Sequence, residues 1–180
     1  MILETERLIL RGWRDADAPS LFKYAKDERV GPPAGWAPHS DEKYSKAVIR
    51  TILAGKETYA ICLKGTDEPI GSIGLMFRDS DERGIPDNTA ELGYWLGVPF
   101  WGRGIAFEAA KEILRHGFED LKLDTIYCGY FEGNERSKKL QQKCGFKYHH
   151  TNSKTHVIML NEIRTEHINT ISRADWRGDH

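Results

Sequence analysis

The sequence predicts one mixed α/β domain over residues 1–180, in which a central sheet carries helices on both faces. A chain of 180 residues with 39% hydrophobic and 29% charged side chains can bury a sizeable core as a single globular unit. Strand-like stretches alternate with helical ones, and a meander followed by crossover connections is typical of a mixed sheet. No linker, internal repeat or low-complexity tract divides the chain.

The first part of the chain predicts a strand, a helix and a loop. Residues 7–13 alternate apolar and polar side chains, which indicates a strand. Asp15 then caps a helix over residues 16–28. The three prolines and two glycines within residues 30–40 predict a loop.

The middle of the chain predicts a second helix and then three strands. Ser40 caps a helix over residues 41–55, and Gly55 ends it. The polar residues 78–88 predict a hairpin loop. The three strands are expected at residues 58–65, 70–79 and 89–97.

The last part predicts a long amphipathic helix over residues 102–120, followed by crossover elements. This helix carries apolar residues at helical spacing, namely Ile105, Ala109, Ile113, Leu114 and Phe118. The remaining elements are expected as strands at residues 125–131, 145–150 and 162–172, with a short helix at residues 135–144.

Charge, cysteine content and hydropathy limit the class of protein. Lys and Arg total 26 and Asp and Glu total 27, a net charge of -1 that argues against nucleic acid or an anionic membrane as a partner. Cys62, Cys128 and Cys144 form no CxxC pair, which indicates reduced thiols. The early charges oppose a signal peptide, and no apolar run reaches about 18 residues. We therefore expect a cytoplasmic protein without a membrane span.

The segment LGVPFWGRGIAF, residues 96–107, predicts a phosphate-binding turn. A strand runs directly into a helix, whose first turn exposes unpaired N–H groups and the positive end of its dipole. Glycines there let a pyrophosphate approach the backbone, and Arg103 adds positive charge. A tight turn that needs glycine only for its geometry is the alternative. No G-K-[ST] follows, so the segment is no Walker loop, and the third glycine of a dinucleotide fingerprint is absent.

Several segments together resemble one enzyme family. W-G-R-G-I-A-x-E-A, preceded by E-L-G-Y-W-L, resembles the acetyl-CoA signature of the GNAT superfamily of N-acetyltransferases. Trp101, the pair Glu108-Ala109 and the opening ETERLILRGWRDADA resemble its RimJ/RimL-like branch, named for enzymes that acetylate N-terminal residues of ribosomal proteins. N-E-R-S-x-K-L-x-x-K-C-G-F, residues 134–146, resembles a second segment of that branch. The resemblance covers nearly the whole chain.

The resemblance implies a fold and a set of cofactor contacts. It implies a mixed, mostly antiparallel sheet of about six to seven strands that splays apart at the cofactor cleft. Acetyl-CoA, and no metal, is then the expected co-substrate. Its pantetheine arm would pair with the backbone of Leu96, Gly97 and Val98 and with the Asn134 side chain. Its pyrophosphate would take backbone N–H groups from Arg103, Gly104, Ile105, Ala106 and Phe107.

Acetyl transfer to an amine needs a neutral nitrogen, and a carboxylate can accept its proton. Glu91 matches a position where GNAT enzymes often carry this base; an exposed charge at the start of a strand is the alternative. The resemblance offers Ser137 as a hydrogen-bond donor to the departing thiolate, because Gln141 stands where many members have a tyrosine. Helix capping by Ser137, or departure of the thiolate with backbone help alone, are the alternatives.

The acceptor site is expected between residues 30–40 and 147–159. Trp36 and Tyr148 are the candidate acceptor contacts, and the histidines His149, His150 and His156 also lie in this region. Adjacent histidines on a strand face opposite ways, and no Cys/His spacing indicates zinc. We therefore predict no metal site.

Three functions are compatible with the sequence. The leading one is acetylation of a peptide or protein N-terminal amine. The second is acetylation of a small amine such as a polyamine, an amino acid or an aminoglycoside. The third is a non-catalytic acyl-CoA-binding domain. A homodimer is left open.

Overall fold

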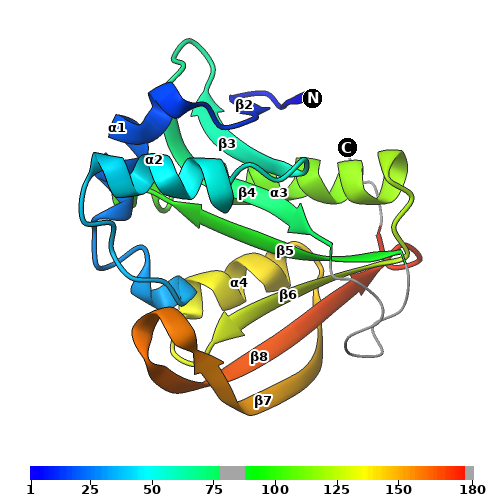
Figure 1. Cartoon of the computed structure of the whole chain (residues 1–180). Helices are drawn as coiled ribbons and strands as arrows, with labels where there is room; N and C mark the ends of the chain where they lie inside the picture. The colour runs from blue at the N-terminus through cyan, green and yellow to red at the C-terminus, as the bar shows by residue number, and fades with distance from the viewer. Residues whose placement is uncertain (78–87, 177–180) are drawn as a thin grey trace.

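The computed structural model describes residues 1–77 and 88–176. Its centre is one sheet of eight strands in the order β1-β2-β3-β4-β5-β6-β8-β7 (Figure 1). The strands are β1 (Ile2–Glu4), β2 (Leu8–Arg11), β3 (Thr58–Leu63), β4 (Pro69–Met76), β5 (Thr89–Leu96), β6 (Thr125–Phe131), β7 (Lys147–Val157) and β8 (Glu162–Ser172).

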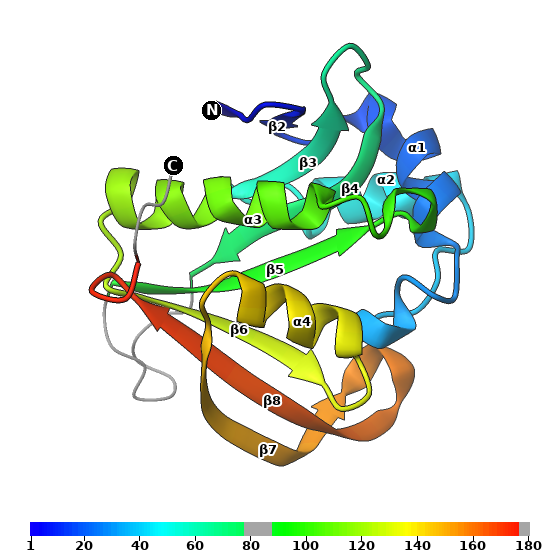
Figure 2. The same cartoon turned by 180° about the vertical axis from the view of Figure 1, so that it is seen from behind.

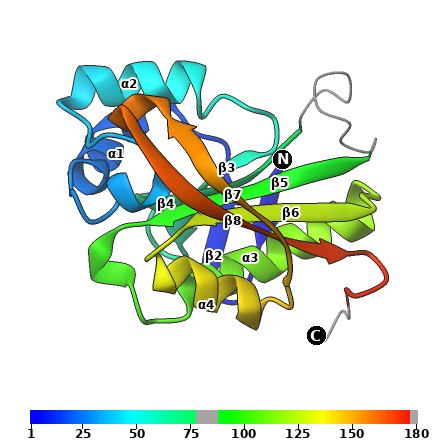
Figure 3. The ribbon, with the colours of Figure 1, turned by 90° about the horizontal axis from the view of Figure 1, so that it is seen from below.

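Helices cover both faces of the sheet, as the sequence predicted. The four α-helices are α1 (Ala18–Ala25), α2 (Glu42–Thr51), α3 (Ile105–Arg115) and α4 (Glu135–Lys143). Figure 3 shows α1 and α2 on one face and α3 and α4 on the other, and Figure 2 shows the second pair from its own side. Within residues 1–77 and 88–176, none of the helices has the length and apolar character needed to cross a bilayer.

The sheet is mixed and mostly antiparallel. The pair β5–β6 is parallel, and the other six described pairs are antiparallel. The sheet has one strand more than the predicted upper number, because the three-residue β1 lies in a segment that the prediction left unassigned. The predicted hairpin loop at residues 78–88 lies outside the described residues except for Asn88.

The apolar face of α3 forms part of the main core. The five apolar residues predicted for this face are all buried, between 0% and 3% exposed: Ile105, Ala109, Ile113, Leu114 and Phe118. Burial of each Ile, Leu or Phe side chain in this set stabilises the fold by about 1.5–3 kcal/mol relative to an exposed one, and burial of the smaller Ala109 side chain by less. The helical spacing of apolar residues therefore predicted correctly which side of α3 meets the sheet.

Three residues that were predicted to begin or end a helix, Ser40, Gly55 and Asp15, do not have that role. The N-cap of α2 is Asp41, whose carboxylate accepts the Tyr44 N–H at 2.7 Å, whereas the Ser40 hydroxyl donates to Asp41. The helix ends at Thr51, so Gly55 lies beyond it. Asp15 does not cap α1; it begins a 3-10 turn and pairs with Arg50 of α2.

The parallel pair β5–β6 opens along its length. Only Thr89–Glu91 of β5 pair with residues of β6, namely Thr125–Tyr127. Beyond that point β5 stays paired with β4 as far as Leu96, and β6 stays paired with β8 as far as Phe131. The two strands therefore diverge toward their carboxyl ends, which confirms the predicted splayed sheet.

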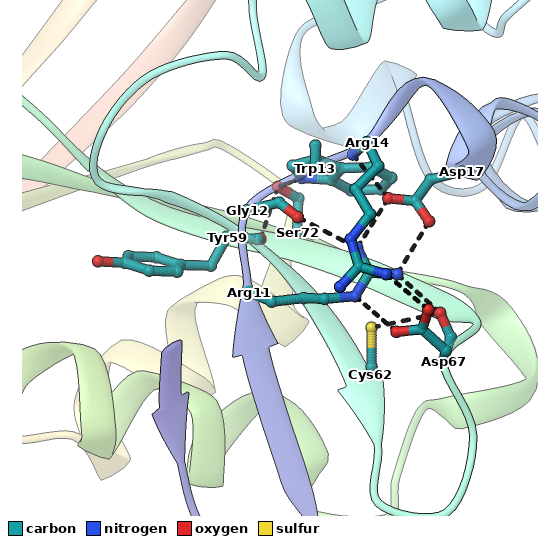
Figure 4. A network of polar contacts seen from close by, with 9 residues as sticks. All are labelled: Arg11, Gly12, Trp13, Arg14, Asp17, Tyr59, Cys62, Asp67 and Ser72. Atoms are coloured by element: carbon teal, nitrogen blue, oxygen red, sulfur yellow. Dashed lines mark hydrogen bonds and ion pairs between the residues drawn. The ribbon is translucent and has the colours of Figure 1, made fainter. Parts of the chain in front are cut away.

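A buried ion network fixes β2 against α1 and the β3–β4 turn (Figure 4). The Arg11 side chain is 3% exposed and donates two hydrogen bonds to the Asp17 carboxylate, at 2.8 and 2.9 Å. It also donates to the Asp67 carboxylate at 2.8 Å and to the Asp67 carbonyl at 2.7 Å. The hydrogen bond from Arg11 lowers the pKa of the Asp67 carboxyl below its ordinary value. Close by, the Trp13 indole donates to the Ser72 hydroxyl at 3.2 Å. The network therefore fixes the chain that carries Trp13 into the site described next.

Candidate active site

A cavity of about 980 Å³ lies where β5 and β6 diverge. It is lined from both faces of the sheet, by α2 and the loop before it on one face and by α3 and α4 on the other. Successive residues of β5 point to opposite faces. Trp95 contacts Trp13 and Trp36 on the α1–α2 face, while Tyr94 contacts Ser137 of α4. The opening thus joins two chemically different compartments.

The turn before α3 has the backbone shape that the glycines predicted. Gly102 and Gly104 both have φ of +73°, a left-handed conformation that costs a residue with a side chain energy. Gly104 is the N-cap of α3, and Ile105, Ala106 and Phe107 form its first turn. A Cβ atom on Gly102 would meet no described atom within 4 Å, so the turn is open to a ligand. The helix N-terminus therefore offers an accessible anion site.

The N-terminal segment holds this turn in place. The Glu108 carboxylate of α3 accepts hydrogen bonds from the Thr5 hydroxyl at 2.5 Å, the Arg7 N–H at 2.8 Å and the Arg7 guanidinium at 2.6 Å. Arg7 also donates to the Arg103 carbonyl at 3.0 Å. Burial raises the pKa of the Glu108 carboxyl, but the donors on Thr5 and Arg7 outweigh it and lower the pKa overall. Two segments of the family resemblance, far apart in sequence, therefore meet at the turn.

Cations on aromatic rings extend the anion site along α4. The Arg136 guanidinium lies 3.7 Å from the centre of the Trp101 ring, and the Lys143 ammonium lies 4.1 Å from that of Phe107. Lys139 lies between them on α4 and also lines the cavity. The sequence analysis named only Arg103 among the cations. Spacings of three and four residues place Arg136, Lys139 and Lys143 on one helix face, and this signal could have identified them.

Several backbone groups that were predicted to hold pantetheine already have partners within the protein. The Leu96 carbonyl accepts the Trp101 indole N–H at 2.7 Å, and the Gly97 N–H donates to the Ile70 carbonyl at 2.8 Å. The carbonyls of Gly97 and Val98 accept N–H groups of the following 3-10 turn. Beyond Glu91, β5 forms no ladder with β6 among the described residues, and the Leu92 carbonyl accepts the Cys128 thiol at 3.3 Å. The pantetheine contact of Leu96, Gly97 and Val98 stays a prediction.

Asn134 caps α4. Its side-chain oxygen accepts the Ser137 N–H at 3.2 Å, and its amide donates to the Pro33 carbonyl at 3.1 Å. Asn134 lines the cavity, but it also ties α4 to the loop at residues 30–40. Because Asn134 is the cap, the Ser137 hydroxyl has a different role, and it lies 2.8 Å from the Tyr94 hydroxyl.

Glu91 lies where the strands separate. It is the last residue of β5 that pairs with β6, opposite Tyr127, and it is half-buried in the cavity wall. Alternation along β5 places its side chain on the same face as Trp95. Glu91 and Ser137 therefore lie on opposite faces of the sheet, both at the opening.

The acceptor side of the cavity is largely aromatic. Trp36 lines it and contacts Trp95, with ring centres 5.9 Å apart, and His39, at 5.5 Å. Burial lowers the pKa of His39, whose ring lies 2.8 Å from the Ser45 hydroxyl. The structure thus brings Trp36 to the cavity, as predicted for an acceptor contact.

Tyr148 and the nearby histidines lie outside the cavity lining. Tyr148 is 66% exposed on β7 and contacts Thr151. The expectation that His149 and His150 face opposite ways was wrong: a register shift between Tyr148 and His150 brings their Nδ1 atoms within 2.7 Å. No group of three or more potential metal ligands occurs among the described residues.

Comparison with known proteins places this geometry in a family. Residues 7–147 match the family model of the acetyltransferase (GNAT) domain. The chain is 33% identical over 150 residues to "Uncharacterized N-acetyltransferase p20" of Bacillus licheniformis, covering 81% of this chain and 82% of that protein. It is 25% identical to "[Ribosomal protein uS5]-alanine N-acetyltransferase" of Escherichia coli, covering 97% of this chain and 92% of that one.

Solved structures give the same fold. A crystal structure of an acetyltransferase (GNAT family) from Bacillus anthracis superposes with a TM-score of 0.84 at 22% identity, and the match covers 97% of this chain and 99% of that one. The similarity to a ribosomal-protein acetyltransferase agrees with the RimJ/RimL-like features of the sequence. The chain therefore belongs to the GNAT family of N-acetyltransferases.

Proposed function

We propose that this protein transfers an acetyl group from acetyl-CoA directly to a primary amine, and that this amine is the N-terminus of a peptide or protein. The observation that carries the proposal is the cavity that passes through the opened sheet, with cations of α4 lining it on one side and the carboxylates of Glu91 and Glu166 on the other. Arg29 also lines the acceptor side, but its guanidinium pairs with Asp27 at 2.6 Å. A donor and an acceptor that enter from opposite faces would meet between β5 and β6.

The cofactor side fits a molecule rich in phosphate. Arg136, Lys139 and Lys143 line the cavity, whereas Arg103 lies outside its lining, 5.8 Å from the centre of the Phe100 ring. Within residues 1–77 and 88–176 these four cations form no ion pair, so their charge is available to a ligand. The open turn at Gly102 and the N-terminus of α3 add backbone donors. Acetyl-CoA would supply the activated thioester, while these residues would bind and orient it.

The acceptor side suits a positively charged or neutral amine. Glu91 and Glu166 both line the cavity. The Glu166 carboxylate lies 2.8 Å from where a Cβ on Gly129 would be, so glycine at that position leaves room for it. The Thr155 hydroxyl donates to Glu166 at 3.1 Å. Two carboxylates attract an ammonium group. Glu91 at the opening can accept a proton from this group, so that the neutral nitrogen can attack the thioester.

The rim of the acceptor side favours a polypeptide over a small amine. Four exposed apolar side chains that line the cavity surround this entrance: Tyr44, Ile52, Met76 and Met159. Such an apolar border provides area for residues that follow an N-terminal amine, whereas a small amine would not cover it. The E. coli relative named for uS5 alanine supports this choice. The carboxylates and the open acceptor side also favour an enzyme over a non-catalytic acyl-CoA-binding domain.

We also propose a cytoplasmic location, which the three scattered cysteines without a CxxC pair favour. A thiol-release assay with acetyl-CoA tests the function. The panel contains peptides with N-terminal alanine or serine, the same peptides with blocked N-termini, and small amines such as spermidine, amino acids and aminoglycosides. We expect turnover with free N-termini and none with the blocked controls. Faster turnover of a small amine than of every peptide would contradict the acceptor assignment.

A further inference from the structure

A short chain of hydrogen bonds surrounds the Ser137 hydroxyl on the cofactor side of the opening. Its oxygen lies 2.8 Å from the Tyr94 hydroxyl of β5 and accepts the Gln141 amide N–H at 3.1 Å. Tyr94 and Ser137 both line the cavity. From the sequence, Gln141 was identified only as a replacement for a tyrosine, and Tyr94 had no predicted role.

The orientation of the Gln141 amide follows from its other partners. Gln141 is 1% exposed, and its Nε2 donates to the Gly129 carbonyl at 3.1 Å. Its Oε1 accepts the Asn169 amide at 2.8 Å. A carbonyl can only accept, so the nitrogen of Gln141 must face Gly129, and the same nitrogen then faces Ser137. Gln141 is therefore a donor to the Ser137 oxygen.

The relative donor strength of the two hydroxyls indicates the direction of the hydrogen bond between Tyr94 and Ser137. The Tyr94 hydroxyl lies 2.8 Å from the Ser137 hydroxyl and 3.4 Å from the Ser137 carbonyl. A phenol is a stronger hydrogen-bond donor and a weaker acceptor than an aliphatic alcohol, so we assign Tyr94 as the donor in the shorter contact, to the Ser137 hydroxyl. Burial is the main cause that raises the pKa of Tyr94 well above its ordinary value, so the phenol keeps its proton at working pH. Both lone pairs of the Ser137 oxygen are then occupied, because a hydroxyl has two acceptor sites and one hydrogen. The Ser137 hydroxyl can act toward the cavity only as a donor.

We propose that Tyr94 and Gln141 are positioning residues that fill the acceptor sites of Ser137 and direct its O–H toward the sulfur of CoA as the thioester breaks. The inference rests on the proposed function. The amine nitrogen attacks the carbonyl carbon, the C–S bond breaks and its electron pair goes to sulfur. The amine proton leaves toward Glu91 or solvent. Ser137 keeps its own proton, because an aliphatic alcohol is far less acidic than a thiol, and stabilises the thiolate by a hydrogen bond.

Ligand binding tests the proposal apart from turnover. CoA and desulfo-CoA, which lacks the thiol, are titrated between pH 6.5 and 9 into the wild type, Ser137→Ala, Tyr94→Phe and Gln141→Met. Tyr127→Phe is the matched control, since this tyrosine of β6 lies outside the cavity lining. A donor to the thiolate makes the preference for CoA over desulfo-CoA rise as the thiol ionises, near the cysteine pKa of about 8.5.

We expect Ser137→Ala to lower this preference about tenfold at pH 9, as for loss of one hydrogen bond to a charged group. Tyr94→Phe and Gln141→Met should each lower it about three- to tenfold, and kcat should fall in parallel. The double variant Tyr94→Phe/Ser137→Ala should match Ser137→Ala alone, because the two act through one hydrogen. Desulfo-CoA affinity should stay unchanged in all variants.

The results distinguish a failure of the positioning role from a failure of the proposed function. If Tyr94→Phe and Gln141→Met both behave like Tyr127→Phe, these residues do not position Ser137. If Ser137→Ala keeps the full preference for CoA over desulfo-CoA, the Ser137 hydroxyl does not donate to the thiolate. Either result overturns the inference while acetyl transfer by the wild type stands. A wild type that binds neither CoA nor desulfo-CoA overturns the proposed function instead.

Discussion

Replacing Gly104 by valine separates the backbone strain of the turn from its role in binding. Gly104 has φ of +73°. Apart from its own helix and chain neighbours, the one described atom within 4 Å of an added Cβ is a nitrogen of the Arg7 guanidinium, at 3.5 Å. The fold therefore loses about 1–2 kcal/mol from the left-handed backbone rather than from a clash. For a chain of this size, that corresponds to a decrease in Tm of about 2–8 °C.

Gly104→Val should weaken CoA binding much more than backbone strain alone explains. The valine methyl groups would stand where the pyrophosphate approaches the first turn of α3, and each lost hydrogen bond to a charged group costs about 1.5–3 kcal/mol. This predicts about 10- to 150-fold weaker binding. Gly65→Val is the matched control, because Gly65 has φ of +85°, lies in the β3–β4 turn, and has no atom of another described segment within 4 Å of an added Cβ.

Calorimetric titration with CoA and thermal melts of both variants provide the assay. We expect similar losses in Tm for Gly104→Val and Gly65→Val, with reduced affinity only for the first. Equal CoA affinity in the two variants would refute the assignment of this turn to the pyrophosphate.

Three further variants test the catalytic base, the cation face and the buried ion network. Glu91→Gln should lower kcat about 10²- to 10⁴-fold with CoA affinity unchanged, and a pH–rate profile should show the loss shrinking as pH rises through the α-amine pKa of about 8; full activity at every pH would exclude Glu91 as base. Arg136→Gln should weaken CoA several-fold at low salt and less at high salt, whereas Lys138→Gln, whose lysine pairs with Glu135, should not; equal effects would contradict the cation face. Arg11→Leu should cost about 3–5 kcal/mol in urea unfolding, because it leaves a buried carboxylate unpaired. The pKa of Asp67 is lowered in the folded state, so its carboxylate stabilises the fold above the unfolded pKa of 3.8, and this stabilisation is lost as pH falls through the lower folded pKa. Arg11→Leu should therefore reduce the loss of stability in acid.

Local patterns predicted the elements and the turn, because their causes are local. Helical spacing identified the buried face of α3, and the pair Gly102 and Gly104 identified a turn with left-handed residues. The length of β7 was underestimated because most of its side chains are exposed and show no alternation. The choice of Asp41 over Ser40 as a cap depended on geometry, since either residue type can fill that role.

Contacts between distant segments could not be read from the sequence. Glu108 meets Arg7 across 101 residues, and Tyr94 meets Ser137 across 43. Both pairs form because the sheet brings β2, β5 and the helices of one face together. The irregularity in β7 also has no marker in the sequence. It brings the His149 and His150 rings together, although they were expected on opposite faces.

Thermal unfolding of the wild type with increasing CoA tests the central assignment most directly. A ligand at about 100 times its Kd stabilises the native state by about 2.7 kcal/mol, which should raise Tm by about 5–11 °C for a chain of this size. We predict this rise with CoA and acetyl-CoA, and no comparable rise with NAD, which lacks the pantetheine arm. A Tm that does not change at millimolar CoA would contradict the assignment of the cavity to acetyl-CoA.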